Sequence, residues 1–117
     1  MDKTVLIVDD EIEILEIMSF ELEDAGFKVI TAGSGNEGMK IIESGNIDFI
    51  ISDVRMKNGS GLDLIEDCRS KNLSTPILLI SGFSDISEED ARAKGAVGII
   101  SKPMDFDKIL SIINQSN

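Results

Sequence analysis

The 117-residue sequence predicts an α/β fold in which a parallel sheet is covered by helices on both faces. Five short apolar runs recur along the chain, and a segment of helical character follows each of them. Several of these runs are continuously hydrophobic rather than alternating, which is typical of strands that are buried on both faces. The regular alternation of strand and helix indicates right-handed crossovers and a doubly wound sheet.

The expected strands are runs rich in aliphatic and β-branched residues, and each is followed by a polar residue or a glycine. They are TVLIV at 4–8, KVITA at 28–32, FIIS at 49–52, ILLIS at 77–81 and VGIIS at 97–101. Because hydrophobicity is continuous rather than alternating in the first, third and fourth runs, we expect helices over both faces of these strands.

The expected helices lie between and after these runs. The first, at 11–26, repeats apolar residues at helical spacing and ends at Gly26, which suits a helix C-terminus. The other four are 36–45, 61–71, 87–95 and 105–115. The segment 87–95 is the least regular, because it is polar and carries few apolar positions.

These elements predict a (βα)₅ arrangement with strand order 2-1-3-4-5, a flavodoxin-like doubly wound sheet. A chain of 117 residues has room for one core, so we expect a single domain over 1–117 and no second module. In such sheets, ligands bind where the carboxyl ends of the strands meet, near the switch in strand order. The residues that follow the apolar runs are therefore the candidates for a functional site.

The chain is strongly acidic, with 22 Asp and Glu residues against 11 Lys and Arg and a formal net charge of -11. This charge disfavours direct binding to nucleic acid or to anionic membranes. The sequence contains no His, so it lacks the usual general base and the commonest transition-metal ligand. Its chemistry must use carboxylates, hydroxyls, Lys or a metal, and any reactive His must come from a partner.

Cys68 is the one cysteine of the chain, and we interpret it as a small buried hydrophobe in the helix 61–71. A lone cysteine forms no internal disulfide, which fits a reducing cytoplasm. No apolar run approaches the roughly 18–20 residues that a membrane span requires, and the first residues lack the basic segment, apolar core and cleavage site of a secretory leader, so we expect no export. We therefore expect a cytoplasmic protein without membrane insertion.

Three carboxylates follow two strands that are neighbours in the expected order. Asp9 and Asp10 follow the first strand, and Asp53 follows the third. Like charges repel at such short range, and a hard divalent cation with oxygen ligands, such as Mg²⁺ or Mn²⁺, relieves that repulsion. The sequence therefore predicts a metal site formed by Asp9, Asp10 and Asp53.

A cation and a hydroxyl are expected at the same edge of the sheet. The fifth strand places Lys102 there, and the fourth places Ser81 and then Gly82. A lysine and a hydrogen-bond donor beside a metal suit phosphoryl transfer, which depends largely on positioning and on neutralising the charge of the transferred oxygens. A carboxylate can serve as the covalent acceptor in such a reaction.

Four motifs together resemble the response-regulator receiver domains of two-component signalling, and the resemblance covers essentially the whole chain. They are VLIVDDE at the first strand, DVRM at the third, LLISG at the fourth and GAVGIISKPM around the fifth. The resemblance implies a phosphoprotein of the two-component or phosphorelay type. It acts as a signalling phospho-acceptor rather than a metabolic enzyme, and its partners are a sensor histidine kinase or histidine phosphotransfer protein and a downstream protein.

The resemblance also implies roles for individual residues. Asp53 is the phospho-acceptor, and the backbone carbonyl of Arg55 joins Asp9, Asp10 and Asp53 as a metal ligand. Ser81, in a loop with Gly82, and Lys102 bind oxygens of the phosphoryl group. The peptide bond between Lys102 and Pro103 is expected to be cis. Arg55 and Phe83 are expected to tune the lifetime of the phosphorylated state.

The chain departs from the pattern of these domains at three places. Lys57 stands where receiver domains often carry Pro, and Ile99 stands where they usually carry a Tyr or Phe that changes rotamer. The segment 81–95 is about one residue shorter than is common. In receiver domains this aromatic side chain changes rotamer together with the residue at the position of Ser81. Because position 99 carries Ile here, that coupled movement cannot occur in the same way.

Three other functions fit the sequence less well. A receiver-like binding module that is never phosphorylated is the alternative, although the complete set of acids, Ser and Lys argues against it. A metal-dependent phosphatase with an Asp nucleophile needs a second acid where this chain has Arg55. Flavin binding would need a phosphate loop rich in Ser and Thr after the first strand, and the chain has no Trp or Tyr to stack on the flavin.

The segment GSGNEG at 33–38 matches the dinucleotide-binding pattern G-x-G-x-x-G. It follows the second strand rather than the first, and the turn after the first strand carries two acids that would repel a pyrophosphate. We interpret its glycines as turn residues and expect no organic cofactor.

Overall fold

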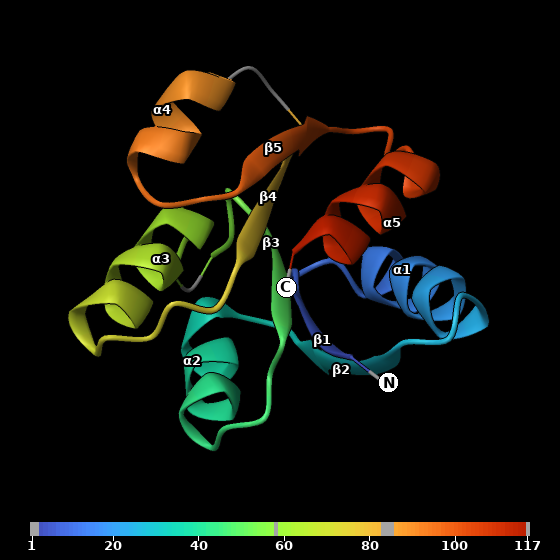
Figure 1. The fold of residues 1–117 in the computed structure, drawn as a ribbon, viewed down its shortest axis with the longest axis horizontal. Helices are drawn as coiled ribbons and strands as arrows, with labels where there is room; N and C mark the ends of the chain where they lie inside the picture. The colour runs from blue at the N-terminus through green and yellow to red at the C-terminus, as the bar shows by residue number, and fades with distance from the viewer. Residues whose placement is uncertain (1–2, 58, 83–85, 117) are drawn as a thin grey trace.

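A computed structural model describes residues 3–57, 59–82 and 86–116, which form a sheet between two layers of helices (Figure 1). Its elements alternate strictly along the chain. They are β1 (Thr4–Val8), α1 (Ile12–Asp24), β2 (Lys28–Ala32), α2 (Gly35–Glu43), β3 (Phe49–Asp53), α3 (Gly61–Ser70), β4 (Ile77–Ser81), α4 (Glu88–Ala93), β5 (Gly98–Ser101) and α5 (Phe106–Gln115).

The strands form one parallel sheet in the order β2-β1-β3-β4-β5, which confirms the predicted topology. The strand β1 lies between β2 and β3. The chain therefore adds β2 on one side of β1 and then adds β3, β4 and β5 in turn on the other side. The register aligns Val8 with Ala32 on one side and with Ser52 on the other. The residues that follow β1 and end β3 therefore lie side by side at the carboxyl edge of the sheet.

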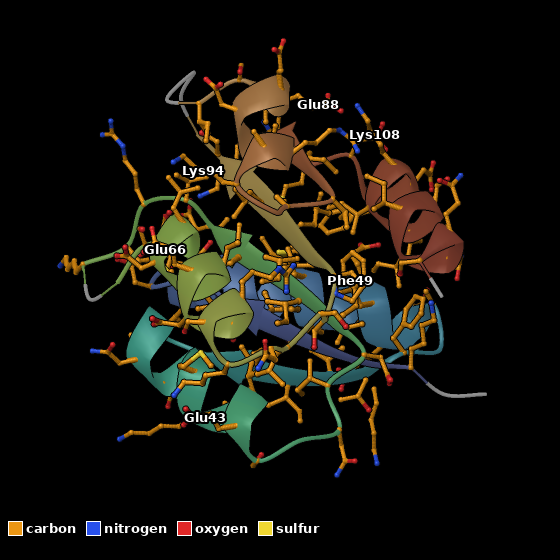
Figure 2. All side chains as sticks on the ribbon, turned by 60° about the vertical axis from the view of Figure 1, so that its left-hand side comes forward. Glu43, Phe49, Glu66, Glu88, Lys94 and Lys108 are labelled. Atoms are coloured by element: carbon orange, nitrogen blue, oxygen red, sulfur yellow. The ribbon has the colours of Figure 1, made fainter. Side chains whose placement is uncertain are left out.

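Helices α1 and α5 cover one face of the sheet, and α2, α3 and α4 cover the other (Figure 1). Successive strand residues point to opposite faces, so β1 sends Val5 and Ile7 to the α1 and α5 side and Leu6 and Val8 to the other. Both faces are fully buried in β1, β3 and β4, which explains their continuous hydrophobicity. Figure 2 shows Phe49 inside the molecule, between the sheet and its helices.

Side chains cap the starts of four helices, and this explains where those helices begin. Ser34, Ser60, Ser87 and Asp105 each accept a hydrogen bond from the backbone N–H three residues later. At the far end of α1, Gly26 has a φ of +100°, a left-handed conformation that glycine adopts readily. The predicted stop at Gly26 is confirmed, and the weak segment 87–95 does contain a short helix.

The observed bounds differ from the expected ones by at most a few residues. The main difference that touches function is in β3, which extends to Asp53 and so makes this acid the last residue of the strand. Of the glycines in 33–38, Gly38 is explained by packing. A Cβ at Gly38 would lie 3.0 Å from a methyl group of Val8, so α2 approaches β1 closely there.

Two further predictions concern the helices. Cys68 is fully buried in α3, and burial raises the pKa of its thiol, as befits a side chain that serves as a small hydrophobe. Among the helices of the described residues, none is long and apolar enough to cross a membrane.

Candidate functional site

The residues predicted to form the site meet at the carboxyl edge of the sheet. Asp9 directly follows β1, Asp53 ends β3, Ser81 ends β4 and Lys102 directly follows β5. The backbone N–H of Asp9 donates to the carbonyl of Ala32, so the hydrogen-bond ladder continues through Asp9. The strands themselves therefore set the positions of these side chains.

The three predicted metal ligands form one cluster. Oxygen atoms of Asp9, Asp10 and Asp53 all lie within 4.8 Å of one another. Asp9 and Asp53 are buried, with 2% and 7% of their surface exposed, whereas Asp10 is exposed. Two carboxylates therefore lie below a third that borders solvent.

Backbone N–H groups close by orient the two buried carboxylates. The N–H of Glu11 donates to Oδ1 of Asp9 at 2.9 Å, and the N–H of Arg55 donates to Oδ1 of Asp53 at 3.3 Å. In both cases the donor lies two residues after the acid, where the chain turns away from the strand. Each bond stabilises the ionised acid, because an N–H dipole then points at a negative oxygen.

The exposed carboxylate of Asp10 is oriented from a different part of the chain. Its Oδ2 accepts a hydrogen bond of 3.1 Å from the backbone N–H of Lys57, in the loop between β3 and α3. This bond joins the loop after β1 to the loop after β3. The two loops that carry the acids of the cluster are thus held together directly.

The surroundings of Asp9 disfavour its ionised form. Burial, with a further contribution from the negative charge of Asp53, raises the pKa of Asp9 from 3.8 to about 6. The N–H of Glu11 and the charge of Lys102 oppose this rise in pKa without cancelling it. In the absence of a cation, the ionised cluster is therefore electrostatically strained.

Lys102 brings a positive charge into contact with the cluster. Its Nζ lies 3.1 Å from Oδ2 of Asp53, 3.4 Å from Oε1 of Glu11 and 3.9 Å from Oδ2 of Asp9. Partial burial lowers the pKa of Lys102, but its hydrogen bond to Asp53 and the surrounding carboxylates outweigh burial and raise it. The lysine is therefore a stable cation beside the proposed acceptor.

Ser81 and Gly82 lie beside this lysine. Ser81 is buried, with 2% of its surface exposed, and its carbonyl accepts a 2.8 Å hydrogen bond from the backbone N–H of Lys102. Gly82 is exposed, and a Cβ there would lie 3.8 Å from Cδ of Lys102. The Lys102–Pro103 peptide bond is cis. Phe83, the other rate-tuning candidate, lies outside the described residues.

The donor set of the cluster fits a hard divalent cation. Carboxylate oxygens are ligands that Mg²⁺ and Mn²⁺ prefer, and three of them converge without a nitrogen or sulfur ligand among the described residues. Burial and, to a smaller extent, the charge of Asp53 raise the pKa of Asp9, so its ionised form is disfavoured although Lys102 lies nearby. A divalent cation at the cluster would stabilise the ionised form of Asp9.

Two contributors to the site were absent from the sequence predictions. Glu11 contacts Lys102, and its position directly after two site acids was the available signal. Gly61 starts α3, and a Cβ there would lie 2.6 Å from the carbonyl oxygen of Asp53 and 2.8 Å from Leu79. Such a close approach depends on tertiary packing and leaves no local sequence signal.

Comparison with known proteins agrees with this geometry. A family described as response regulator receiver domain matches residues 5–114. The chain belongs to this family. Receiver domains of two-component response regulators are phosphorylated by histidine kinases or histidine phosphotransfer proteins, and they bind Mg²⁺ at an acidic pocket.

Curated relatives of this receiver domain are longer proteins. The acid tolerance regulatory protein ActR of Rhizobium meliloti (strain 1021) is 34% identical over 115 residues, which are 97% of this chain and 59% of ActR. The transcriptional regulatory protein GlrR of Escherichia coli (strain K12) is 28% identical over 112 residues, which are 95% of this chain and 25% of GlrR. The chain thus spans less than two thirds of these relatives.

Solved receiver structures share the fold over the whole chain. The chemotaxis response regulator CheY4 of Vibrio cholerae has a TM-score of 0.88 and 32% identity, and the match covers 100% of both chains. The response regulator protein TrrA of Thermotoga maritima, solved in complex with Mg(2+)-BeF, has a TM-score of 0.88 and 31% identity. That match covers 98% of this receiver domain and 99% of TrrA.

The departure at position 99 has a structural counterpart. Ile99 is half-buried, and its side chain packs against the core cluster on the α2, α3 and α4 side. Together with Ser81, Ile86 and Lys108 it lines a surface cavity of about 610 Å³ between α4, β5 and α5. The side chain that stands in place of an aromatic residue is therefore within the same hollow as the site serine.

Proposed function

We propose that Asp53 accepts a phosphoryl group from a partner histidine kinase or histidine phosphotransfer protein, in a reaction that depends on Mg²⁺. The observation that carries this proposal is the convergence of three carboxylates with Lys102, whose Nζ lies 3.1 Å from Oδ2 of Asp53. Family membership and the TrrA structure with Mg(2+)-BeF support it.

In the proposed reaction, an oxygen of the ionised Asp53 forms a bond to phosphorus. The bond between phosphorus and the imidazole nitrogen of the donor breaks, and its electron pair leaves with the imidazole. The product is an acyl phosphate on Asp53, and hydrolysis later returns inorganic phosphate. The chain contains no His, so the phosphohistidine belongs to the partner.

Asp9, Asp10, Asp53 and the backbone carbonyl of Arg55 are the proposed ligands of the metal. When bound, Mg²⁺ neutralises charge on the acids and on the phosphoryl oxygens. The N–H groups that hold the buried carboxylates keep them oriented while the reaction proceeds. Burial of Asp53 limits water around its carboxylate, which strengthens these electrostatic interactions.

Lys102 and Ser81 are the proposed ligands of the phosphoryl oxygens. The ammonium of Lys102 pairs with Asp53 in the structure described here, and we propose that it shifts to a phosphoryl oxygen after transfer. The hydroxyl of Ser81 binds a second oxygen, with the Gly82 backbone beside it. Arg55 is exposed at the rim of the pocket and, with Phe83, is the proposed regulator of hydrolysis.

We propose that phosphorylation changes how this receiver domain docks on a downstream protein, or that the phosphoryl group is relayed to a second histidine-bearing protein. The net charge of -11 directs the proposal toward protein partners rather than nucleic acid. Signalling of this kind requires no catalytic turnover beyond phosphorylation and dephosphorylation of the chain itself.

Intact-mass spectrometry after incubation with acetyl phosphate tests the proposal. We expect the mass to increase by one phosphoryl group when Mg²⁺ is present and to stay unchanged when it is chelated. The Asp53→Asn variant should gain nothing, whereas Asp48→Asn, which removes an acid away from the site, should behave as the wild type. A phosphoryl group on Asp53→Asn would show that another residue is the acceptor.

A wild-type protein that gains no phosphoryl group should next be incubated with phosphorylated histidine phosphotransfer proteins. Failure with those donors as well would favour a receiver-like binding module that is never phosphorylated.

A further inference from the structure

The hydrogen bond from Lys57 to Asp10 differs in kind from the bonds that hold the other two acids. Asp9 and Asp53 each accept a bond from a residue two positions later in the same turn. The donor to Asp10 is 47 residues away along the chain, in the loop between β3 and α3. This bond therefore forms only when that loop is correctly placed.

Asp10 has more need of such a bond than the buried acids. Asp9 and Asp53 are packed inside the edge of the sheet, whereas Asp10 is exposed and its side chain has room to adopt other rotamers. The bond to Oδ2 restricts that freedom. In the orientation that the bond holds, Asp10 presents an oxygen within 4.8 Å of ligand atoms of Asp9 and Asp53.

The donor depends on the residue type at position 57. Receiver domains often carry Pro there, and Pro has no backbone N–H, so it cannot make this bond. The exposed side chain of Lys57 is not the donor, and any residue other than Pro would supply the same backbone group. The interaction is therefore a consequence of the departure from Pro in this chain.

The loop that carries this donor is anchored on its far side. Gly59 has a φ of +91°, and a Cβ there would lie 3.5 Å from Cα of Gly35 at the start of α2. Ser60 caps α3 in a reciprocal arrangement with Asp63, in which each side chain accepts a bond from the other residue's N–H. The N–H of Lys57 thus belongs to a loop held between two helices.

We propose that the backbone N–H of Lys57 is a positioning group for the metal site, because it holds Asp10 in the orientation that binds Mg²⁺. The inference rests on the proposed function, since it takes the three carboxylates as the metal ligands. If the N–H of Lys57 positions Asp10, the Mg²⁺ affinity of this receiver domain depends on the conformation of the loop between β3 and α3.

Variants at position 57 separate the N–H from the charge and from the stiffness of the loop. Lys57→Ala removes the charge and keeps the N–H, Lys57→Gly also loosens the backbone, and Lys57→Pro removes the N–H. Mg²⁺ affinity of the unphosphorylated proteins is measured by calorimetry and by amide chemical shifts. We expect Lys57→Pro to bind Mg²⁺ about 10-fold more weakly than Lys57→Ala, as for other partners that orient a metal ligand.

Lys57→Ala and Lys57→Gly should bind within about 2-fold of the wild type, a difference smaller than the loss of a typical hydrogen bond would cause. The amide resonances of Ser60 and Asp63 report whether the cap of α3 survives in Lys57→Pro. Equal Mg²⁺ affinity of Lys57→Pro and Lys57→Ala would overturn this inference but would leave the proposed metal site intact. The inference would also be overturned if Lys57→Gly bound Mg²⁺ as weakly as Lys57→Pro. The stiffness of the loop, and not the N–H group, would then be the cause of the lost affinity.

A wild-type protein that binds no Mg²⁺ would overturn both this inference and the metal site on which it rests. Binding by the wild type together with loss in Lys57→Pro alone supports both. The two failures are therefore distinguishable in one series of titrations.

Discussion

The site has an acidic half, Asp9, Asp10 and Asp53, and a cationic half, Ser81 and Lys102, and the two are built differently. The acidic half is held by short side chains and by backbone N–H groups from the adjoining loops. The cationic half relies on the long side chain of Lys102, which lies within 4.0 Å of three competing carboxylates. One half is fixed by the backbone, whereas the other can change partners.

This difference suits the proposed chemistry. Metal binding requires carboxylates that are already in place, because reorienting them would cost affinity. A phosphoryl group that arrives and leaves requires a cation that can follow it, and a lysine on four methylene groups can do so. The two halves therefore predict different responses to substitution.

The largest effect is expected in the acidic half. The double variant Asp9→Asn, Asp10→Asn should weaken Mg²⁺ binding by more than about 100-fold, because even partners of metal ligands contribute up to that factor. Calorimetric titration measures the affinity. The variant Glu13→Gln, Glu16→Gln makes the same change in charge on α1 and should bind as the wild type; a similar loss there would point to net charge instead of ligands.

The next largest effect is expected in the cationic half, and it should leave the metal in place. Lys102→Ala should slow phosphorylation by about 100-fold, as loss of one charge-stabilising group does in enzymes. Its Mg²⁺ affinity should be equal to or tighter than that of the wild type, because a competing cation is gone. Timed mass spectrometry and calorimetry measure the two quantities.

Lys71→Ala is the matched control, since Lys71 pairs with Glu43 away from the site. A parallel loss of Mg²⁺ affinity in Lys102→Ala would contradict the division into two halves.

A third comparison uses one glycine beside each half of the site, Gly61 beside Asp53 and Gly82 beside Lys102. Gly61→Ala should lower the free energy of unfolding by about 3 kcal/mol, because its Cβ would meet backbone and Leu79 with no room to move. Gly82→Ala should change it by less than about 0.5 kcal/mol, since its Cβ would make an ordinary contact with the flexible Lys102 side chain. Urea denaturation of both variants checks this, and equal effects would count against a rigid acidic half.

The smallest effect concerns the strain in the cluster without metal. The pKa of Asp9 is about 6 in the folded protein against 3.8 ordinarily, so folding favours its protonated form. The penalty is absent below about pH 4 and complete above about pH 6, and stability of the wild type falls across that window. Asp9→Asn removes the penalty and should be more stable at neutral pH by about 2 kcal/mol, somewhat less than the full shift implies.

The measurement is urea unfolding of both proteins in EDTA between pH 4 and 7.5. The difference in the free energy of unfolding should grow as pH rises through the window and then level off. A difference that is constant over this range would show that the burial of Asp9 imposes no electrostatic penalty.

Prediction from sequence succeeded where a physical signal is local or periodic. Continuous hydrophobicity located β1, β3 and β4, and Gly26 marked the end of α1, because burial on both faces and a left-handed turn each restrict residue type. The order of the strands then brought Asp9 and Asp53 to one edge. These inferences need only the chain order and the two-sided burial of a parallel sheet.

Features of the site could not be predicted from the sequence where they depend on contacts between distant segments of the chain. Nothing near Gly61 indicates that α3 approaches the carbonyl of Asp53. The position of Glu11 after two acids places it near the site, but it does not reveal the contact with Lys102, 91 residues away. The raised pKa of Asp9 likewise depends on how deeply the folded chain buries it. Such effects arise from packing between distant segments, which the local pattern of residues does not reveal.

By itself, the sequence determined the (βα)₅ architecture, the order of the strands and the set of acids, hydroxyl and lysine at one edge of the sheet. Only the tertiary structure decided which atoms meet there, including the bond from the Lys57 N–H to Asp10 and the three-way competition for Lys102. The reason is physical: residue type and periodicity decide which surfaces are buried, whereas distances of a few ångströms between loops follow from the packing of the whole chain.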